Sequence, residues 1–360
     1  MTNLNELKRE FVDLLDEQLG GRAIYCSDDW FAGCENLVKK ADPIFKEGHF
    51  VATGQWMDGW ESRRSFGRHT RETDHDWCVL RLGAPGTVKW LNIDTSHFRG
   101  NAPKEAAIDY ACQPKGPEQH LEWSELLPKT LIEANSPNVL KIDNANHATH
   151  LRLRIYPDGG VARLRAFGDV KVNRAAILEG ELVDLASVLL GGKGQQCSNE
   201  FYSSPNNLLM PKPGINMGDG WETKRRRDKE NDWCIIKLGV PGDVRKAIVD
   251  TSHFKGNYPD YCTIEGAVLP GDGIDSALAE WKTILEATLL QPDREHIFVE
   301  PEHSPSRERF THIRFNIFPD GGVSRLRIIG APSWDLSLIH ISEPTRLLSI
   351  AYAVVCLKKK

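Results

Sequence analysis

The sequence contains one ordered set of motifs twice, and this internal repeat is its strongest constraint on the fold. The matched segments are 58–61 with 219–222, 76–78 with 232–234, 94–98 with 250–254, and 163–165 with 325–327. Their order never changes, and the spacing between copies drifts only slightly, as insertions in surface loops would cause. The chain is therefore predicted to be one structural unit duplicated in tandem.

The repeat sets the expected domain boundaries. The chain has 360 residues, which at roughly 150 residues per domain predicts two domains. We place the first at residues 1–170 and the second at residues 175–335. Residues 338–360 have no counterpart in the first copy and closely resemble the translated read-through of a sequencing adaptor. We interpret them as an artefactual tail and exclude them from the fold.

Each copy shows the period-two pattern of strands that are buried on one face. Leu151, Leu153 and Ile155 alternate with polar or aromatic neighbours, which is typical of a half-buried strand. A Pro-Asp-Gly-Gly segment follows, and residues 161–167 alternate again, so a β-hairpin is predicted here. Further strands are predicted, with counterparts in the second copy, at residues 77–82 and 88–94.

Helical patterns are fewer. An apolar stripe that starts at Leu7 and ends before Gly20 predicts one helix, with a counterpart at residues 177–190. A second pair is predicted at residues 121–134 and 278–290, anchored by Trp123 and Trp281. Mostly strands with minor helices predict an all-β chain of two tandem β-sandwiches, each a jelly roll.

Composition narrows the class of protein. The net charge of −5 argues against non-specific binding to nucleic acid, which needs a basic face. We find no signal peptide at the N-terminus and no apolar run of membrane-spanning length. The eight cysteines have no Cys-x-x-Cys spacing, so they are expected to be reduced thiols of a cytoplasmic protein rather than zinc ligands.

The repeated Asp-Gly-Trp-Glu segment is the first candidate for chemistry. Carboxylates such as Asp58 and Glu61 can act as acid, base or ligand, while Trp60 offers a flat apolar wall with one N–H donor. Asp219, Trp221 and Glu222 repeat the set. The alternative is a loop packed by a buried tryptophan, with the acids facing water.

The second candidate is the pair of histidines His97 and His253. Histidine is the commonest general acid or base near neutral pH, and a nearby Asp94 or Asp250 would fix the tautomer of the ring. Ser96 and Ser252 lack the Gly-x-Ser-x-Gly turn of a serine nucleophile. The alternative is a polar turn with a structural histidine.

Arginines form the third candidate. Guanidinium groups alternating along one strand face suit planar carboxylates, through paired hydrogen bonds; these are Arg163, Arg165, Arg325 and Arg327. The alternative is a solvated sheet face. His150 and His312 precede these strands, but no local spacing supports a metal site, so we predict no bound metal.

Several long motifs in fixed order resemble the allantoicase family. They are residues 55–64, 75–78, 93–101, 218–226 and 250–257. The resemblance extends over about residues 5–335. It implies two allantoicase repeats, each a jelly-roll sandwich similar to galactose-binding-like domains. It also implies hydrolysis of allantoate to ureidoglycolate and urea in purine degradation, by an oligomeric enzyme for which no cofactor is expected.

The resemblance gives each candidate residue an expected role. Arginines would bind the carboxylate of allantoate, with Asp58, Trp60, Asp219 and Trp221 completing the substrate pocket. His97 or His253 would transfer protons, with Glu61 and Glu222 as the rival acid–base pair. Which repeat carries the working site stays open. The competing hypotheses are a non-enzymatic ligand-binding β-sandwich and another ureido-compound hydrolase, with or without a divalent metal.

Overall fold

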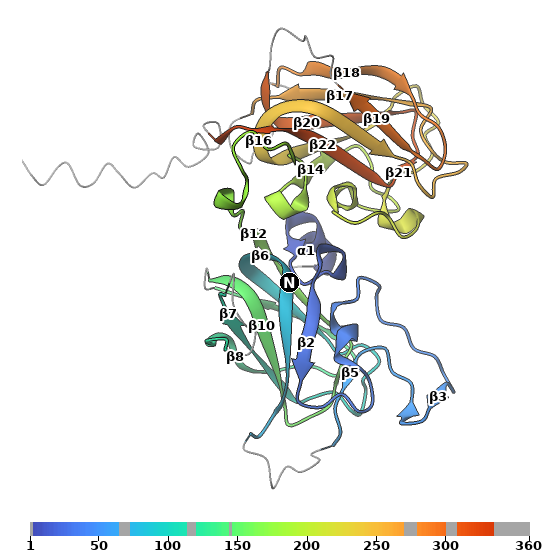
Figure 1. Cartoon of the computed structure of the whole chain (residues 1–360). Coiled ribbons are helices and arrows are strands. Elements are labelled where there is room, and N and C mark those ends of the chain that lie inside the picture. Colours follow the sequence, from blue (N-terminus) through green and yellow to red (C-terminus); the bar gives the residue numbers. More distant parts are fainter. Residues whose placement is uncertain are drawn as a thin grey trace, which may run out of the picture.

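The computed structural model describes residues 3–64, 73–113, 120–143, 146–269, 279–299 and 308–334. Each repeat forms its own β-rich body, and the N-terminal helix α1 (Leu4–Glu10) lies between the two (Figure 1). Among the described residues, no helix combines the length and hydropathy needed to cross a bilayer. The tail at 338–360 lies outside the described residues.

The two repeats contain matching sets of strands and short 3-10 helices. Those of the first repeat are β1 (Val12–Asp13), η1 (Glu17–Leu19), β2 (Arg22–Cys26), η2 (Cys34–Val38), β3 (Phe50–Val51), β4 (Gly54–Gln55), β5 (Trp60–Glu61), β6 (Asp76–Asp94), β7 (Glu105–Ala111), β8 (Ser124–Leu131), β9 (Pro137–Lys141), β10 (His147–Tyr156), β11 (Gly160–Val161) and β12 (Arg163–Val170). Those of the linker and second repeat are η4 (Arg174–Ala176), β13 (Val183–Asp184), η5 (Val188–Leu190), β14 (Lys193–Cys197), η6 (Pro205–Leu209), η7 (Met217–Asp219), β15 (Trp221–Glu222), β16 (Asp232–Asp250), β17 (Tyr261–Ala267), β18 (Lys282–Leu289), β19 (Glu295–Val299), β20 (Arg309–Phe318), β21 (Gly322–Val323) and β22 (Arg325–Pro332).

Strand order confirms two all-β, jelly-roll-like sandwiches. In the first repeat the order is β1-β12-β6-β10-β7-β8, with β2 and β9 also pairing β6, and the second repeat follows the same plan around β16. The first part of β6 pairs with β10, while its last part pairs with β12. The predicted strands at 77–82 and 88–94 are therefore two halves of one long strand that belongs to both layers of the sandwich.

The predicted hairpin is wrong. Strands β10 and β12 do not pair with each other; both pair with β6, at different ends. The Pro-Asp-Gly-Gly segment instead leads into β11, which pairs with β5. The turn therefore carries the chain from one layer of the sandwich to the other, and period-two alternation cannot report which strand is the partner.

The helix predictions fail for physical reasons. Residues 121–134 contain strand β8, which lies at the edge of its sheet against β7. Pro128 interrupts any helix there but is tolerated in an edge strand. Its counterpart β18 is also a strand. The N-terminal stripe divides into α1, β1 and η1, and only the stop at Gly20, with φ of 98°, matches the prediction.

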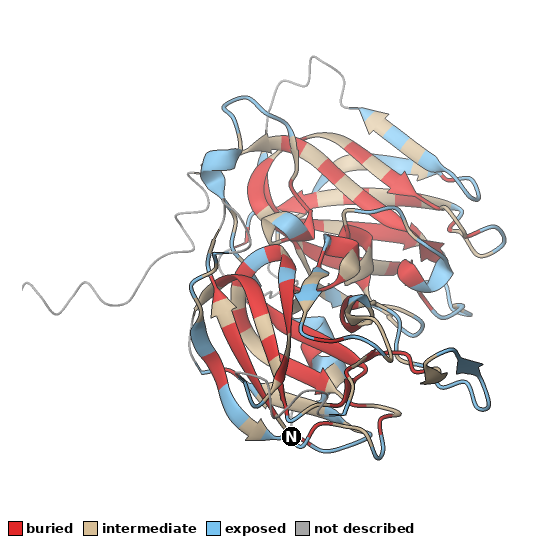
Figure 2. Cartoon of the chain, turned by 60° about the horizontal axis from the view of Figure 1, so that its bottom comes forward, coloured by how far each residue is buried: buried red, intermediate tan, exposed pale blue. Residues whose placement is uncertain are grey.

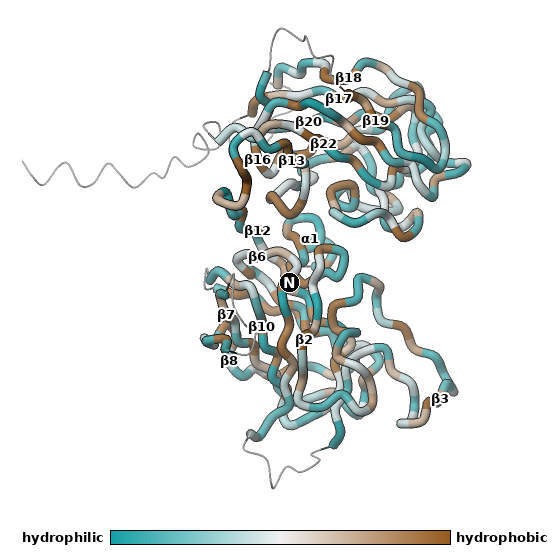
Figure 3. Tube along the Cα trace, viewed as in Figure 1, coloured by the Kyte–Doolittle hydropathy of each residue, from teal (hydrophilic) through white to brown (hydrophobic). Residues whose placement is uncertain are grey.

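The predicted alternation does locate the core. Leu151, Leu153 and Ile155 are fully buried, whereas Arg152 and Arg154 are half-buried. Buried residues follow the strands of both sandwiches (Figure 2), and apolar residues recur along the same strands in the hydropathy view (Figure 3). Burial of these side chains supplies the main driving force for the fold.

Candidate active site

The repeated motifs meet where β5, β11 and the loop after β6 come together. In the first repeat, Glu61 pairs with Gly160 across the β5–β11 ladder. Asn101 accepts a hydrogen bond from the backbone N–H of Gly160 at 2.8 Å and donates its amide to Oε1 of Glu61 at 2.8 Å. We call Glu61 and Asn101, together with His97 four residues before Asn101 in the same loop, and their counterparts Glu222, Asn257 and His253, the strand-end clusters.

Glycines let this loop pack closely. A Cβ atom on Gly160 would lie 2.0 Å from ring atoms of Phe98, and one on Gly59 would lie 2.6 Å from the carbonyl oxygen of Val161. Phe98 is fully buried, so its ring forms a floor beneath the cluster. The second repeat has the same arrangement, with Gly322 against Phe254.

The carboxyl group of Glu61 is suited to hold a proton. Burial raises its pKa above the ordinary value, although the hydrogen bond from Asn101 and the charge of Arg64 act in the opposite direction. In the second repeat, the amide of Asn257 donates to Oε1 of Glu222 at 2.6 Å. A carboxyl with a raised pKa can serve as a general acid nearer to neutral pH than an exposed one.

His97 is held by the backbone in an unusual conformation. Its φ is 72°, and its backbone N–H donates to Oδ1 of Asn135 at 2.8 Å. Nε2 of its ring lies 3.1 Å from the carbonyl oxygen of Pro43. Because a carbonyl can only accept, Nε2 must carry the hydrogen, and Nδ1 of the neutral ring is left with a lone pair.

His253 repeats this arrangement with different supports. Its φ is 74°, its N–H donates to Oδ1 of Asp293 at 2.8 Å, and its Nε2 lies 2.9 Å from the carbonyl oxygen of Gly214. A non-glycine residue at positive φ is uncommon and requires support from its surroundings. Both repeats therefore present a histidine with the same tautomer and the same free nitrogen.

The expected pairing of histidine with Asp94 or Asp250 is wrong. Oδ1 of Asp94 accepts the N–H of Ser96 at 2.8 Å, and Oδ1 of Asp250 accepts the N–H of Ser252 at 2.8 Å. These aspartates shape the turn before each histidine, while a backbone carbonyl orients the ring. The sequence places the acid near the histidine but does not reveal what the acid binds.

Arg163 and Arg325 lie inside the protein, which contradicts their expected contact with substrate. Arg163 is 1% exposed and donates to Oδ2 of Asp58 at 2.8 Å and to the carbonyl oxygens of Asp58, Ala162 and Ala41. Arg325 makes the matching bonds to Asp219. These guanidinium groups hold the loops beneath the clusters in place.

Asp58 and Asp219, which pair with these arginines, are also fully engaged in structural contacts. Burial alone would raise the pKa of Asp58, but hydrogen bonds from Arg163 and from the N–H of Ile44 outweigh it, so the pKa is lowered. Lys39 also lies 3.7 Å from this carboxylate. Asp58 and Asp219 are thus structural anions of buried ion pairs rather than free substrate ligands.

The tryptophans are also internal. Trp60 and Trp221 are fully buried, and their indole N–H groups donate to the carbonyl oxygens of Asp28 and Asn199 at 2.8 and 2.9 Å. Burial contradicts the prediction that they line the substrate pocket. The alternative of a loop packed by a buried tryptophan holds for the two rings, but its acids Asp58 and Asp219 are buried rather than facing water.

The second arginine of each strand faces a different place. Arg165 donates to the carbonyl oxygen of Lys40 at 3.0 Å and lies 3.4 Å from Asp13. Arg327 donates to the carbonyl oxygen of Pro211 at 3.1 Å and lies 3.7 Å from Asp184. The four arginines do not form one carboxylate-binding row.

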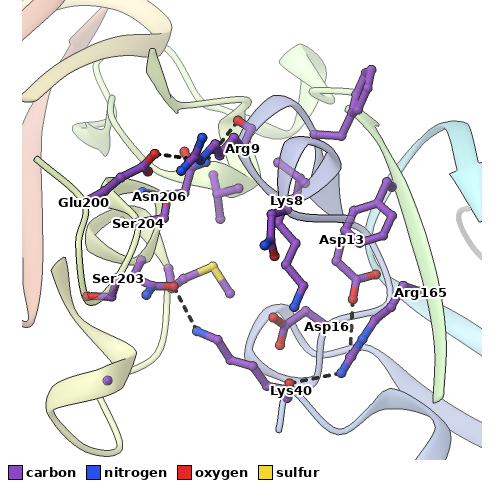
Figure 4. A pocket seen from close by; sticks show the side chains of 18 of the residues that line it. Lys8, Arg9, Asp13, Asp16, Lys40, Arg165, Glu200, Ser203, Ser204 and Asn206 are labelled. Carbon is purple, nitrogen blue, oxygen red and sulfur yellow. Dashed lines mark hydrogen bonds and ion pairs between the residues drawn. The ribbon is translucent and has the colours of Figure 1, made fainter. Parts of the chain in front are cut away.

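Arg165 lines a cavity of about 670 Å³ between the repeats. Lys8, Asp16 and Lys40 from the first repeat line it opposite Glu200 and Ser203 of the second (Figure 4). Charged groups here are paired: Lys40 with Asp219 and Asn207, and Arg9 with Glu200 at 2.6 Å. Ion pairs therefore link the two repeats across this cavity, which we call the junction.

Asp16 makes the junction sensitive to pH. Burial, followed by the nearby charge of Asp13, raises the pKa of Asp16 from 3.8 to about 6. Below about pH 4 a carboxyl with a raised pKa is protonated in both the folded and the unfolded state, so it does not change the free energy of unfolding. It destabilises the fold increasingly as the pH rises towards 6, and the full cost remains above that.

Replacing Asp16 with asparagine is therefore expected to stabilise the protein at pH 8 by up to about 3 kcal/mol, at about 1.4 kcal/mol per pKa unit. Asparagine keeps the side-chain oxygen that accepts the N–H of Gln18 at 2.7 Å. Urea unfolding between pH 4 and pH 8 would measure the gain, which should shrink as the pH falls from 6 to 4. A gain independent of pH, or an equal gain from Asp42→Asn at an exposed position of the same cavity, would contradict this account.

Two functional candidates were missed from the sequence. Asn101 and Asn257 orient the glutamates, and the signal was the Gly-Asn pair that recurs after each histidine motif. Arg64 is exposed and its charge acts on Glu61; Arg225 occupies the matching position of the second repeat. His150 and His312, by contrast, are buried, and each bonds the hydroxyl of the preceding threonine at 2.8 Å.

Comparison with known proteins agrees with the duplicated architecture. The family model described as "Allantoicase repeat" matches residues 12–171 and 183–333. A "Probable allantoicase" from Pseudomonas fluorescens (strain Pf0-1) is 46% identical over 326 residues, covering 89% of this chain and 96% of the relative. "Probable allantoicase 1" from Burkholderia mallei is 44% identical over 333 residues, covering 91% and 96%. The crystal structure of allantoicase from Saccharomyces cerevisiae superposes with a TM-score of 0.73 at 32% identity, covering 90% of this chain and 94% of that one.

Proposed function

The chain belongs to the allantoicase family and hydrolyses allantoate to ureidoglycolate and urea in purine degradation, and we propose that each repeat carries one active site at its strand-end cluster. The observation that supports two sites is that both repeats share one arrangement: a Glu–Asn hydrogen bond and, four residues before that Asn, a histidine whose Nε2 faces a carbonyl oxygen. The β-sandwich fold requires neither the Glu–Asn bond nor the oriented histidine, yet each repeat has both.

The substrate explains why these groups are needed. Allantoate has a carboxylate and two ureido groups on one carbon, and hydrolysis must break one carbon–nitrogen bond. The departing urea nitrogen needs a proton, and the remaining ureido nitrogen can push out the leaving group to form an imine-like carbon. Water then adds to that carbon and loses a proton. One acid and one base therefore suffice for the reaction.

We assign the acid to Glu61 and the base to His97 in the first repeat. The protonated carboxyl of Glu61 gives its proton to the urea nitrogen as the bond breaks, and the amide of Asn101 holds the resulting carboxylate. Nδ1 of His97 accepts the proton from the attacking water. At the end of the cycle, the proton that His97 took from water returns to the carboxylate of Glu61. Both groups then regain their starting protonation states. Glu222, His253 and Asn257 have the same roles in the second repeat.

The carboxylate of allantoate needs a cation that is not already committed. Arg163 and Arg325 are buried in ion pairs, so we assign this contact to Arg64 in the first repeat and Arg225 in the second. Arg64 is exposed and acts electrostatically on Glu61. A planar guanidinium can bind the carboxylate through two parallel hydrogen bonds. The chemistry proposed here uses side chains alone and needs no cofactor.

The experiment that tests this proposal measures urea release from allantoate by the purified chain. Replacing both His97 and His253 with glutamine should lower kcat by about 10²–10⁴-fold, because a positioned base contributes about that much. Glutamine can still donate to the carbonyl oxygens of Pro43 and Gly214 but cannot accept a proton. Ser96→Ala with Ser252→Ala provides the matched control on the same turns, and should retain activity. Full activity in the histidine double variant would overturn the assignment.

We further propose that the enzyme is cytoplasmic and assembles with copies of itself. The seven cysteines among the described residues are free thiols, which supports a reducing compartment. The exposed fractions of Ile44, Phe45 and Phe50 are 51%, 48% and 69%. They lie on the segment around β3 that projects from the first repeat (Figure 1), and such exposed apolar side chains support an interface. Light scattering should give a mass above that of one chain, and serine variants of Ile44 and Phe45 should lower it.

A further inference from the structure

Three potential metal ligands of the first repeat lie together outside the strand-end cluster. Sγ of Cys26, a carboxylate oxygen of Asp29 and Sγ of Cys34 all lie within 4.8 Å of one another. The thiol of Cys78 lies next to Cys34 and donates towards the carbonyl oxygen of Val79 at 3.9 Å. Cys26 and Cys34 are half-buried and Asp29 is exposed, so an ion could enter from solvent.

The fold brings these residues together from three separate elements. Cys26 ends β2 and lies directly across from Cys78 in β6. The chain then turns, with Oδ1 of Asp28 accepting the N–H of Trp30 at 2.9 Å, and returns so that Cys34 begins η2. The spacing along the sequence resembles no zinc motif, because the third thiol, Cys78, comes from a strand more than forty residues further along the chain.

The donor set suits one kind of cation. Thiolates and carboxylates bind zinc tetrahedrally, with Zn–S bonds of about 2.3 Å, which places two sulfurs roughly 3.8 Å apart. The ligand atoms of Cys26, Asp29 and Cys34 lie within 4.8 Å of one another, so they need to move only by about an ångström to reach that geometry. The thiols must lose their protons when the ion binds, so zinc affinity should rise with pH.

The second repeat provides an internal comparison. It keeps the cross-strand cysteine pair, Cys197 with Cys234. Pro205 begins η6 where Cys34 begins η2. The acid is Glu200, whose carboxylate pairs with Arg9 at 2.6 Å. Among the described residues, only the first repeat brings three potential metal ligands together in this place.

We propose that Cys26, Asp29 and Cys34 bind one zinc ion, with the neighbouring thiol of Cys78 moving in as the fourth ligand. The ion would fasten the loop between β2 and η2 to the sheet. That loop pairs with β5, because the N–H of Glu61 donates to the carbonyl oxygen of Ala32 at 3.0 Å and the N–H of Phe31 donates back to Glu61 at 3.2 Å. Metal binding would therefore steady the strand that carries Glu61, but only in the first repeat. The zinc site itself does not depend on the proposed catalytic roles.

Cobalt titration of the metal-free full-length chain tests the site. Co²⁺ should give a thiolate-to-cobalt charge-transfer band in the near ultraviolet that saturates at one ion per chain, and Zn²⁺ should abolish it. Cys34→Ser should lose the band, while Cys197→Ser, in the second repeat, should keep it. Zinc should also raise the unfolding temperature of the wild type and Cys197→Ser but not of Cys34→Ser. A band that survives in Cys34→Ser, or no saturable binding by the wild type, would overturn the proposal.

A second measurement needs no variant. Iodoacetamide labelling of the wild type, read by mass spectrometry, should show that zinc protects Cys26 and Cys34 while exposed Cys112 still reacts. Equal labelling with and without zinc would refute the site, as would isolation of the folded chain with a Cys26–Cys34 disulfide that excludes the metal.

Discussion

Replacing both Glu61 and Glu222 with glutamine is expected to lower kcat for urea release by about 10²–10⁴-fold, the usual contribution of a positioned general acid. Glutamine has nearly the same shape and can still accept the hydrogen bond from Asn101 or Asn257, which are the observed partners of the two glutamates. What it lacks is the proton for the departing urea. The loss should therefore appear in kcat, with little change in KM.

The single variants show how the work is divided. If each repeat has a working site, Glu61→Gln and Glu222→Gln should each retain the share of the untouched repeat. Glu125→Gln with Glu286→Gln, at exposed positions on β8 and β18, provides the matched control. Because the pKa of Glu61 is raised, the share of the first repeat should fall as the pH rises through that pKa. A double variant with wild-type activity would contradict the assignment.

The largest expected effect on stability comes from Arg163→Met. Breaking a buried ion pair by removing one partner typically costs about 3–5 kcal/mol, because the other charge stays buried without compensation. Here Asp58 would be left, and the carbonyl oxygens of Ala41 and Ala162 would lose their donor. The free energy of unfolding, measured with urea, should fall by about that amount.

An exposed arginine and the loss of both charges provide the controls. Arg99→Met removes an exposed arginine and should change stability little. The double variant Asp58→Leu with Arg163→Met removes both charges and should be more stable than Arg163→Met alone. Equal unfolding midpoints for Arg163→Met, Arg99→Met and the wild type would show that the buried pair does not hold the loops.

Sequence patterns predicted the fold where the signal was local. The duplication, the alternation of Leu151, Leu153 and Ile155, and the polar motif around His97 were all readable, and the structure places them in two β-sandwiches. The apolar stripe at 121–134 predicts a helix but contains strand β8, because an edge strand that buries a few leucines imitates helical spacing. Pro128 was the residue that argued against it.

The limits at the site have a similar cause. Alternation along β12 shows that Arg163 and Arg165 share a face, but not whether that face meets solvent, a buried aspartate or the other repeat. Asp94 is close to His97 in sequence, yet a local turn takes up its carboxylate. The ring's true partner is the carbonyl oxygen of Pro43, and a backbone atom from a distant loop leaves no trace in side-chain motifs.

A crystal structure of the Glu61→Gln, Glu222→Gln double variant soaked with allantoate would test the central claim most directly. We predict one allantoate in each repeat, beside Asn101 and His97 in the first and beside Asn257 and His253 in the second. Allantoate found instead in the cavity between the repeats, beside Lys40 and Arg165, would contradict it.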